Sequence, residues 1–318
     1  MRSFRFGIMP YVGSWGLPMN EWVKSVRRYE KLGYDTLFQC DHFYETIYDP
    51  IAMLASAAVA TENLHIGTLV FNVDYRHPVV LAKAAATLHL LSNGRFEFGI
   101  GAGWNELEYD NAGIMFDRPG RRIERLEEAL RIIRGMWTQE KTSFDGRHYV
   151  INDIDRAGDL PEGEHPTIIV GGGGKKVLSV AGRHGDIVGI NVSVPHGNLS
   201  DAIKRQSVDR VIRQIGWAEA AAVDYGRDLD DIEFQMHVPW VKITDEPESA
   251  YKEMADAYGI TVDEAVACPK IMFGSSSEIV SRLKELREVT GICYYSFGLD
   301  DAESIDEFAK SVIRRLRM

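Results

Sequence analysis

Eight short apolar segments recur along the 318-residue chain, and each is followed by sequence with helical spacing of its apolar residues. These segments have the length and composition of buried strands, and proline or glycine marks several of the expected helix ends. The expected strands lie at residues 4–9, 35–40, 64–70, 96–100, 168–170, 186–192, 232–243 and 292–297. Strands that alternate with helices pair in parallel through helical crossovers. Eight such units in one chain predict an α/β fold, a closed (β/α)8 TIM barrel, in preference to an open sheet.

The organisation of the chain indicates one domain over residues 1–318, because no repeat, low-complexity tract or linker divides it. Residues 138–165 lack helical spacing and are expected to form an insertion or loop, with a small hairpin around 144–147. Loops are also expected at 13–18 and 104–118, and a break at 269–277 between helical pieces. These loops are expected to shape a substrate pocket, for which the sequence offers no readable motif.

Charge and cysteine content restrict the partners that the chain can have. It carries 36 basic and 47 acidic residues, for a net charge of −11. This charge disfavours nucleic acid and anionic membrane surfaces as main partners. The three cysteines are widely spaced, the N-terminal residues lack a long apolar run, and the apolar tract near 51–60 is too short to span a bilayer. We therefore expect a cytoplasmic protein that acts on a small molecule.

Four consecutive glycines, Gly171, Gly172, Gly173 and Gly174, separate an expected strand from a helix expected to begin at Lys175. Glycines let backbone amides approach an oxyanion, and a helix start adds unpaired donors. The run predicts an anion site, although a tight strand-to-helix turn without a ligand has the same sequence. It is not a Walker A loop, because its spacing lacks the first glycine and the final Ser or Thr.

Candidate catalytic residues are those that follow the strands, because the active sites of TIM barrels lie at the carboxyl ends of the strands. His42 is the best acid–base candidate, since imidazole titrates near neutrality and Asp41 is adjacent. Neighbouring residues on a strand face opposite ways, so their direct pairing stays open, and a histidine bonded only to backbone has the same sequence. Trp104 is a candidate wall for an aromatic ring or a rim residue. Asn72 and Asn191 are ligand donors or ordinary turn residues.

Other chemistries lack their motifs. The nine histidines are scattered without an H-E-x-x-H motif, so we expect no metal site. The G-x-S-x-G elbow of hydrolases is also missing.

The seventh expected strand is predicted to place either His237 or Trp240 at the site, depending on where the strand ends. An anion cradle, a histidine and flat aromatic surfaces together suit a phosphorylated planar cofactor that performs the chemistry.

Several motifs taken together resemble the bacterial luciferase-like superfamily, and particularly its coenzyme F420-dependent oxidoreductases. They lie at residues 40–43, 67–70, 94–104, 171–174, 181–186 and 291–295. The resemblance implies a barrel of luciferase-like type that binds a flavin or deazaflavin across its top. The same resemblance implies that His42 handles a proton beside the ring and that the glycine run holds the cofactor phosphate.

The resemblance also implies further site residues. A non-prolyl cis peptide is implied near Leu69 and Val70, behind the ring. The implied cofactor contacts are Asp41, Leu69, Val70, Asn72, Ala102, Gly103, Gly171, Gly172, Gly173, Gly174 and Asn191. Trp104 and Trp15 are the aromatic residues that we assign to the substrate pocket.

Three hypotheses follow from these observations. The first is an F420-dependent oxidoreductase that moves a hydride between the deazaflavin and a small organic substrate. The alternative is an FMN-dependent monooxygenase that receives reduced flavin from a partner reductase, and the third is a non-catalytic flavin-binding or structural barrel. Relatives of this type imply a homodimer. Two departures argue against glucose 6-phosphate as substrate: Trp104 stands where the sugar-phosphate dehydrogenases have a glutamate, and residues 44–46 lack their tryptophan.

Overall fold

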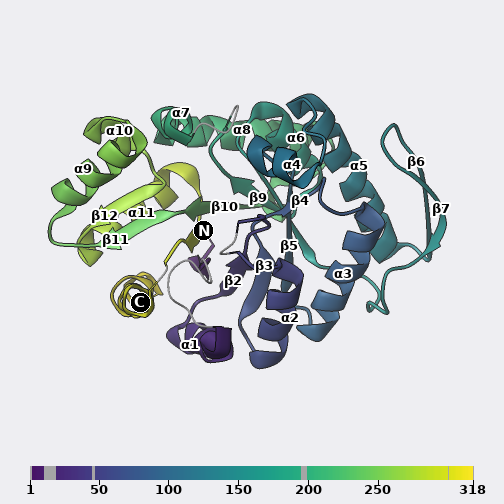
Figure 1. Ribbon diagram of the computed structural model, residues 1–318, viewed down its shortest axis with the longest axis horizontal. Coiled ribbons are helices and arrows are strands. Elements are labelled where there is room, and N and C mark those ends of the chain that lie inside the picture. Colours follow the sequence, from purple (N-terminus) through teal and green to yellow (C-terminus); the bar gives the residue numbers. More distant parts are fainter. Residues whose placement is uncertain (1, 11–18, 45–46, 195–198, 300, 318) are drawn as a thin grey trace.

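Eight parallel strands close into a barrel in the computed structural model, which describes residues 2–10, 19–44, 47–194, 199–299 and 301–317 (Figure 1). Around the barrel the order is β1, β2, β3, β5, β8, β9, β10 and β13, and β13 pairs with β1. Their bounds are Arg5–Ile8, Thr36–Gln39, His65–Thr68, Phe96–Gly101, Thr167–Gly172, Ile187–Ile190, Glu233–Val238 and Tyr294–Phe297. A short strand β4, Phe71–Asn72, continues from β3 along β5. The predicted TIM barrel is confirmed.

The helices begin and end where local chemistry predicts. Proline occupies the first turn of α2, α3 and α5, and the Asp49 carboxylate caps α2 by accepting a hydrogen bond from the Ala52 amide. The helices are α1 Trp22–Leu32, α2 Pro50–Ala60, α3 Pro78–Leu91, α4 Glu106–Ala112, α5 Pro119–Thr138, α6 Lys175–His184, α7 Leu199–Lys204, α8 Val208–Asp224, α9 Pro247–Tyr258, α10 Val262–Ala267, α11 Ser276–Thr290, α12 Ala302–Phe308 and α13 Arg314–Arg317. Short helical turns are η1 Met19–Glu21 and η3 Leu229–Asp231, and η4 Ala309–Ile313 is π-helical.

The barrel interior is filled by a few large side chains that face glycines. The Phe38 ring lies so close to Gly7 and Gly67 that a Cβ atom at either position would stand 2.7 Å from a ring carbon. Val70 has the same relation to Gly101, where a Cβ would stand 2.8 Å from a Val70 methyl group. Because protein interiors are close-packed, the large residue and the glycine opposite it form one packing unit.

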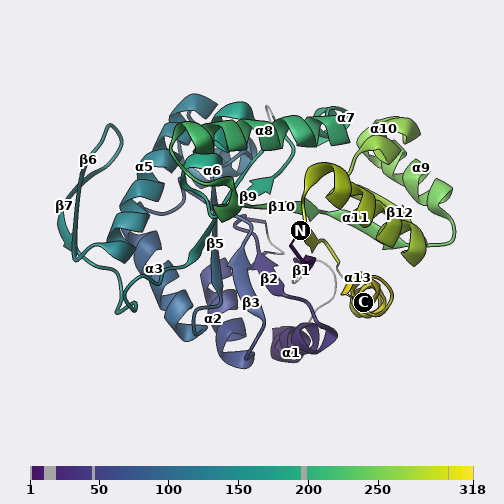
Figure 2. The same cartoon turned by 180° about the vertical axis from the view of Figure 1, so that it is seen from behind.

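The seventh predicted strand is wrong as a single element. The barrel strand β10 ends at Val238, and after Pro239 the chain forms β11, Trp240–Ile243, which pairs in parallel with β12, Ile271–Gly274, in a separate sheet. Proline has no amide proton for a ladder, so it favours the break. Strand β12 occupies the predicted interruption at 269–277, which corrects that expectation as well. Figures 1 and 2 show this small sheet with α9 and α10 at one end of the molecule.

The segment 138–165 was expected to be an insertion or loop and 104–118 a loop, and each contains regular secondary structure. Strands β6, Lys141–Asp145, and β7, Val150–Asp155, form an antiparallel hairpin, which confirms the small hairpin expected within 138–165 (Figure 2). The predicted loop at 104–118 is wrong in part, because α4 lies within it and ends at Gly113 in a left-handed conformation. Among the described residues no helix combines the length and apolarity that crossing a membrane requires.

Candidate active site

The side chain of His42 is paired with a carboxylate that the sequence did not single out. His42 follows β2, and its Nδ1 lies 2.9 and 3.0 Å from the two carboxylate oxygens of Glu108, which is on α4. Glu108 is only 5% exposed, and it also accepts a hydrogen bond from the Tyr75 hydroxyl at 3.1 Å. A carboxylate at Nδ1 fixes the ring and holds the proton on that nitrogen. The Nε2 atom is therefore the one left to accept or return a proton.

Aromatic rings flank this histidine. Tyr44 stacks on it with ring centres 5.2 Å apart, and Trp104 meets it edge-on at 5.8 Å. Burial, together with the Glu108 charge, raises the pKa of the Tyr44 and Tyr75 hydroxyls, so both remain neutral at physiological pH. Trp104 thus lies beside His42, and its role as a pocket wall stays a prediction.

Asp41 has partners other than His42, which answers the question left open by their adjacency. Its Oδ2 accepts hydrogen bonds from the Asn72 amide at 3.0 Å and from the Arg76 guanidinium at 2.7 Å. Arg76 also bonds Asp49 at 2.9 Å. Asp41 therefore ties the end of β2 to β4, and its implied cofactor contact stays a prediction.

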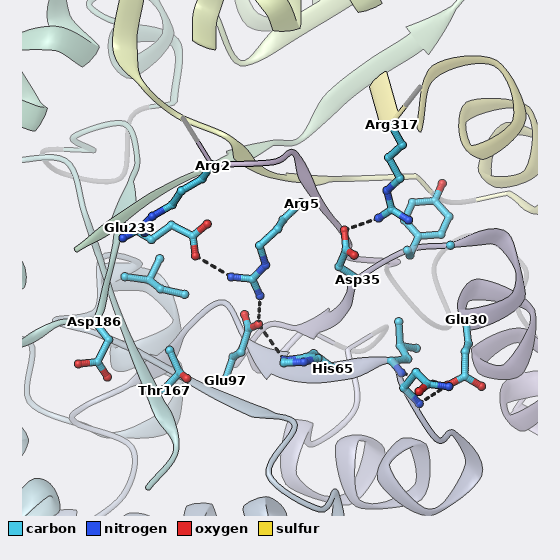
Figure 3. A pocket seen from close by; sticks show the side chains of 15 residues that line it. Arg2, Arg5, Glu30, Asp35, His65, Glu97, Thr167, Asp186, Glu233 and Arg317 are labelled. Atoms are coloured by element: carbon cyan, nitrogen blue, oxygen red, sulfur yellow. Dashed lines mark hydrogen bonds and ion pairs between the residues drawn. The ribbon is translucent and has the colours of Figure 1, made fainter. Parts of the chain in front are cut away.

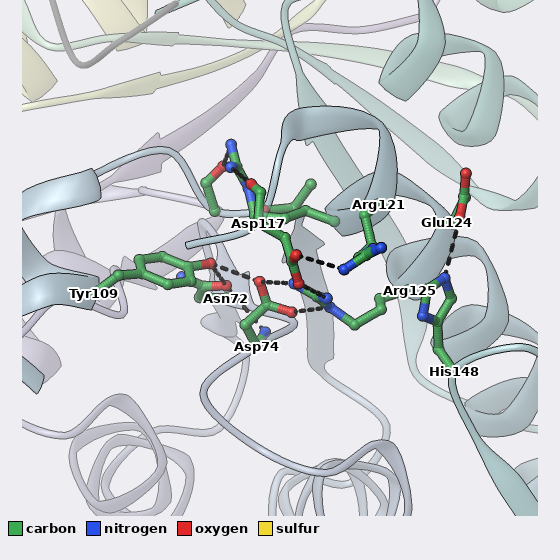
Figure 4. Close-up of polar contacts among 11 residues, drawn as sticks. Asn72, Asp74, Tyr109, Asp117, Arg121, Glu124, Arg125 and His148 are labelled. Carbon is green, nitrogen blue, oxygen red and sulfur yellow. Dashed lines mark hydrogen bonds and ion pairs between the residues drawn. The ribbon is translucent and has the colours of Figure 1, made fainter. Parts of the chain in front are cut away.

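A polar network fixes the helix that carries Glu108 (Figure 4). The Tyr109 hydroxyl lies 2.8 Å from Asn72 Oδ1 and 2.9 Å from Asp74 Oδ2. Arg125 on α5 donates to both oxygens of Asp74, at 2.7 and 3.0 Å. Because Tyr109 follows Glu108 directly in α4, this network holds the carboxylate in reach of His42. Asn72 therefore has a structural role, and its predicted cofactor contact stays a prediction.

A cis peptide joins Leu69 to Val70, at the place where the family resemblance implied one. It lies between β3 and β4, and the Val70 side chain packs against glycines of β5 and β8. A Cβ atom at Gly171 would stand 3.1 Å from a Val70 methyl group. Leu69 and Val70 thus form the inner wall at the carboxyl end of the barrel.

The backbone after β5 is held by hydrogen bonds from a buried arginine. Arg122, on α5 and 5% exposed, donates to the carbonyl of Ala102 at 3.1 Å and to that of Gly103 at 3.4 Å. Gly103 has φ of 71°, and a Cβ there would stand 2.0 Å from the Tyr109 hydroxyl. Only glycine fits this position, because both the dihedral angle and the space exclude a side chain.

The glycine run lies at the carboxyl end of β8, the fifth barrel strand, as predicted. The first amides of α6 have no intrahelical partner, and Gly174, its N-cap, has no side chain that could accept from them. A Cβ at Gly173 would stand 2.4 Å from the Val192 carbonyl, whereas one at Gly174 would have its nearest neighbour, Ser193 Oγ, at 3.9 Å. Asn191 is exposed nearby, and its Oδ1 accepts from the Val192 amide at 2.8 Å, as a turn residue does.

Two buried groups lie near the ends of β9 and β10. His237 Nδ1 is 2.9 Å from Ser296 Oγ, while its buried Nε2 has no partner among the described residues. Lys270, which the sequence did not single out, donates to the carbonyls of Ile190 at 3.0 Å and His237 at 2.8 Å. Burial lowers the pKa of His237 to about 3 and that of Lys270 to about 7. His237 is therefore a neutral ring near the carboxyl end of β10, and Trp240 lies outside the barrel in β11.

A cavity of about 650 Å³ lies at the opposite, amino-terminal ends of the strands (Figure 3). Its charges pair with one another: Arg5 contacts Glu97 and bonds Glu233 at 2.6 Å, and His65 lies 3.2 Å from Glu97. In TIM barrels this face serves stability and the opposite face serves catalysis. We therefore assign the ion pairs of this cavity to the stability of the fold.

The structure brings most predicted site residues to one face of the barrel. They lie at or just after the carboxyl ends of the strands: His42, Asp41, Leu69, Val70, Asn72, Ala102, Gly103 and Trp104 at β2 to β5, and Gly171, Gly172, Gly173, Gly174 and Asn191 at β8 and β9. Trp15 lies outside the described residues. Glu108, which contacts His42, and Tyr75, which contacts Glu108, were missed because they reach the site from distant parts of the chain, with no local motif to mark them.

Comparisons with known proteins agree with this architecture. The family model of the luciferase-like monooxygenases matches residues 3–291. The chain is 27% identical to an F420-dependent glucose-6-phosphate dehydrogenase of Amycolatopsis mediterranei (strain U-32), with 93% of this chain and 94% of the relative covered. It is 29% identical to the enzyme of that name from Intrasporangium calvum, with 93% and 95% covered. A solved F420-dependent secondary alcohol dehydrogenase, in complex with an F420-acetone adduct, superposes with a TM-score of 0.78 at 19% identity, covering 98% of this chain and 99% of that one.

Proposed function

The chain belongs to the luciferase-like monooxygenase family, and on that premise we propose that it is a coenzyme F420-dependent oxidoreductase. It moves a hydride between the deazaflavin and a small organic substrate. One observation carries the proposal: a histidine oriented by a buried carboxylate lies at the same end of the barrel as an uncapped glycine run. The two relatives named as F420-dependent, each covering 93% of this chain, support the choice of cofactor.

The residues present fit such a cofactor. The run at 171–174 ends in an uncapped helix start, with open space at Gly174 that suits a phosphate. Leu69 and Val70 form a wall for the ring system. When bound, F420 accepts or gives up a hydride, which is the two-electron chemistry of the reaction.

We assign the proton transfer of the reaction to His42. A substrate that loses a hydride from carbon also loses a proton, and His42 Nε2 takes that proton in oxidation and returns it in reduction. Glu108, 2.9 Å from Nδ1, stabilises the positive charge that the ring gains. Trp104 and Tyr44 exclude water on two sides of the imidazole.

The cofactor assignment is tested by titrating the purified protein with F420 and with FMN while cofactor fluorescence is recorded. We expect tighter binding of F420. Tighter binding of FMN would favour the FMN-dependent monooxygenase with its partner reductase, and binding of neither would favour a non-catalytic barrel. His42→Ala is expected to slow turnover more than it weakens cofactor binding.

The substrate named for the relatives, glucose 6-phosphate, is not carried over to this chain. The resemblance places Trp104 where those dehydrogenases have a glutamate, and here Glu108, four residues later, brings the carboxylate to His42. Incubation with F420 and glucose 6-phosphate tests this point. Formation of reduced F420 at a rate typical of an enzyme would show that the departure is compensated.

The proposal also includes the oligomeric state and the cellular location of the protein. We infer that residues 1–318 act as one barrel domain with an insertion at 138–165, as a homodimer in the cytoplasm. Light scattering after size-exclusion chromatography checks the dimer. We infer no nucleic acid or membrane partner.

A further inference from the structure

We propose that a pocket beside the glycine run binds the carboxylates that follow the phosphate in the tail of coenzyme F420, an inference that rests on the proposed function. The pocket has a volume of about 340 Å³. Its lining residues come from the segment after β9, from α7, from the connection between α7 and α8, and from α8: Ser193, Ala202, Arg205, Gln206, Arg210 and Arg213. Figures 1 and 2 show α8 beside α6, the helix that begins at the glycine run, and α7 at the far end of α8.

The pocket is joined to the glycine run by a chain of buried amides. Gln206, which lines the pocket, donates to Gln214 Oε1 at 3.0 Å. Gln214 then donates to the carbonyl of Gly173 at 2.8 Å and to that of Asn191 at 2.9 Å. Ser193 lies on the border of the two sites, because it lines the pocket and its Oγ would stand 3.9 Å from a Cβ at Gly174.

The charge of the pocket is uncompensated. Arg205, Arg210 and Arg213 form no ion pair within the part of the chain that the structure describes, although the whole chain has a net charge of −11. Other arginines near the site, such as Arg76 and Arg125, are each held by two carboxylates. Three like charges around one small cavity repel one another, and a bound anion removes that repulsion.

Two of the three arginines are free to receive carboxylates, and the third packs on an aromatic ring. Arg205 and Arg213 are exposed, and the guanidinium of Arg210 is held 4.7 Å above the Trp217 ring. A guanidinium fork binds carboxylate groups through two parallel hydrogen bonds. FMN ends at its phosphate, whereas the chain of F420 continues beyond the phosphate into carboxylates. A basic pocket next to the phosphate cradle therefore matches F420 and has no partner group in FMN.

The test measures how tightly one variant binds three ligands: F420, the deazaflavin that lacks phosphate and tail, and FMN. Arg205→Gln/Arg213→Gln removes both exposed charges and leaves Arg210 on its tryptophan. We expect the affinity for F420, followed by fluorescence, to fall about tenfold, as for two partly screened ion pairs. Affinity for the deazaflavin that lacks phosphate and tail is expected to change less than twofold. Lys252→Gln/Lys284→Gln, on the exposed faces of α9 and α11, makes the same change in net charge and is expected to leave all affinities unchanged.

Two results would overturn the inference. Unchanged affinity for F420 in the double arginine variant would show that the pocket does not hold the tail. An equal loss for F420 and FMN would show that the arginines serve the phosphate instead. Failure of the unaltered protein to bind F420 would be a different outcome, because it removes the proposed function together with this inference.

Discussion

Glu108→Gln is expected to slow turnover about 10- to 100-fold while cofactor affinity changes little. The substitution keeps the size of the side chain and removes the charge that faces His42 Nδ1 at 2.9 Å. Hydrogen bonds to a charged group contribute about 1.5–3 kcal/mol, and screening is weak at a carboxylate that is 5% exposed. Because about 1.4 kcal/mol corresponds to a factor of ten in rate, the expected loss is one to two powers of ten.

The assay is steady-state reduction of F420, followed by its absorbance, with a substrate found by screening small alcohols and carbonyl compounds. The loss should fall on kcat, since Glu108 acts when the imidazole becomes charged. Tyr75→Phe is the matched control, because it removes a neutral donor to the same carboxylate at 3.1 Å and should cost much less.

A double-mutant cycle decides whether Glu108 acts through His42. In a His42→Asn background, Glu108→Gln should have almost no further effect, because residues that act as a unit are not additive. Additive losses would refute the reasoning, and so would a normal kcat with a weakened affinity for F420.

Three further predictions concern the cradle and the fold. Gly174→Asp places a carboxylate in the open space of the cradle and should weaken binding of phosphate-bearing cofactors by an order of magnitude or more. Gly174→Ala should retain that binding. Equal cofactor affinities of the two variants would show that the phosphate binds elsewhere. Gly103→Ala should lower the free energy of unfolding in urea by about 1–3 kcal/mol, since φ is 71° and Tyr109 occupies the space; an unchanged midpoint would contradict this. Hydrogen bonding by His184, with Arg183 beside it, lowers the pKa of Glu127 from 4.5 to about 2, so its contribution is present above pH 4.5 and lost as the pH falls toward 2. With a third of that side chain exposed, Glu127→Gln should cost about 1 kcal/mol at pH 7 and progressively less in urea titrations below pH 4.5; a cost independent of pH would exclude the ion pairs as its cause.

The barrel could be predicted from the sequence because its signals are local. Apolar runs, N-terminal prolines and C-terminal glycines fall within a few residues of the ends that they determine, as at Pro50 and Gly33. The prediction of one continuous strand at 232–243 was wrong because its local signals continue past the end of the barrel strand. Apolar content continues through Trp240 and Val241, so only Pro239 marks the point where the chain leaves the barrel.

The composition of the site was predictable only in part. His42 and the glycine run stand out because their residue types are informative where a strand ends. Glu108 does not, because it lies 66 residues from His42 and belongs to a short helix in a segment that reads as a loop. The contact depends on the packing of α4 through Tyr109 and Arg125, which one sequence does not reveal.

The packing of Phe38 against two glycines has a consequence for how such barrels diverge. A single ring fills the space that belongs to β1, β2 and β3, so its volume is shared among positions far apart in the chain. Substituting any one of the three alone creates a void or a clash. In an alignment of relatives these positions should therefore covary: a smaller residue at position 38 should be accompanied by larger ones at positions 7 and 67.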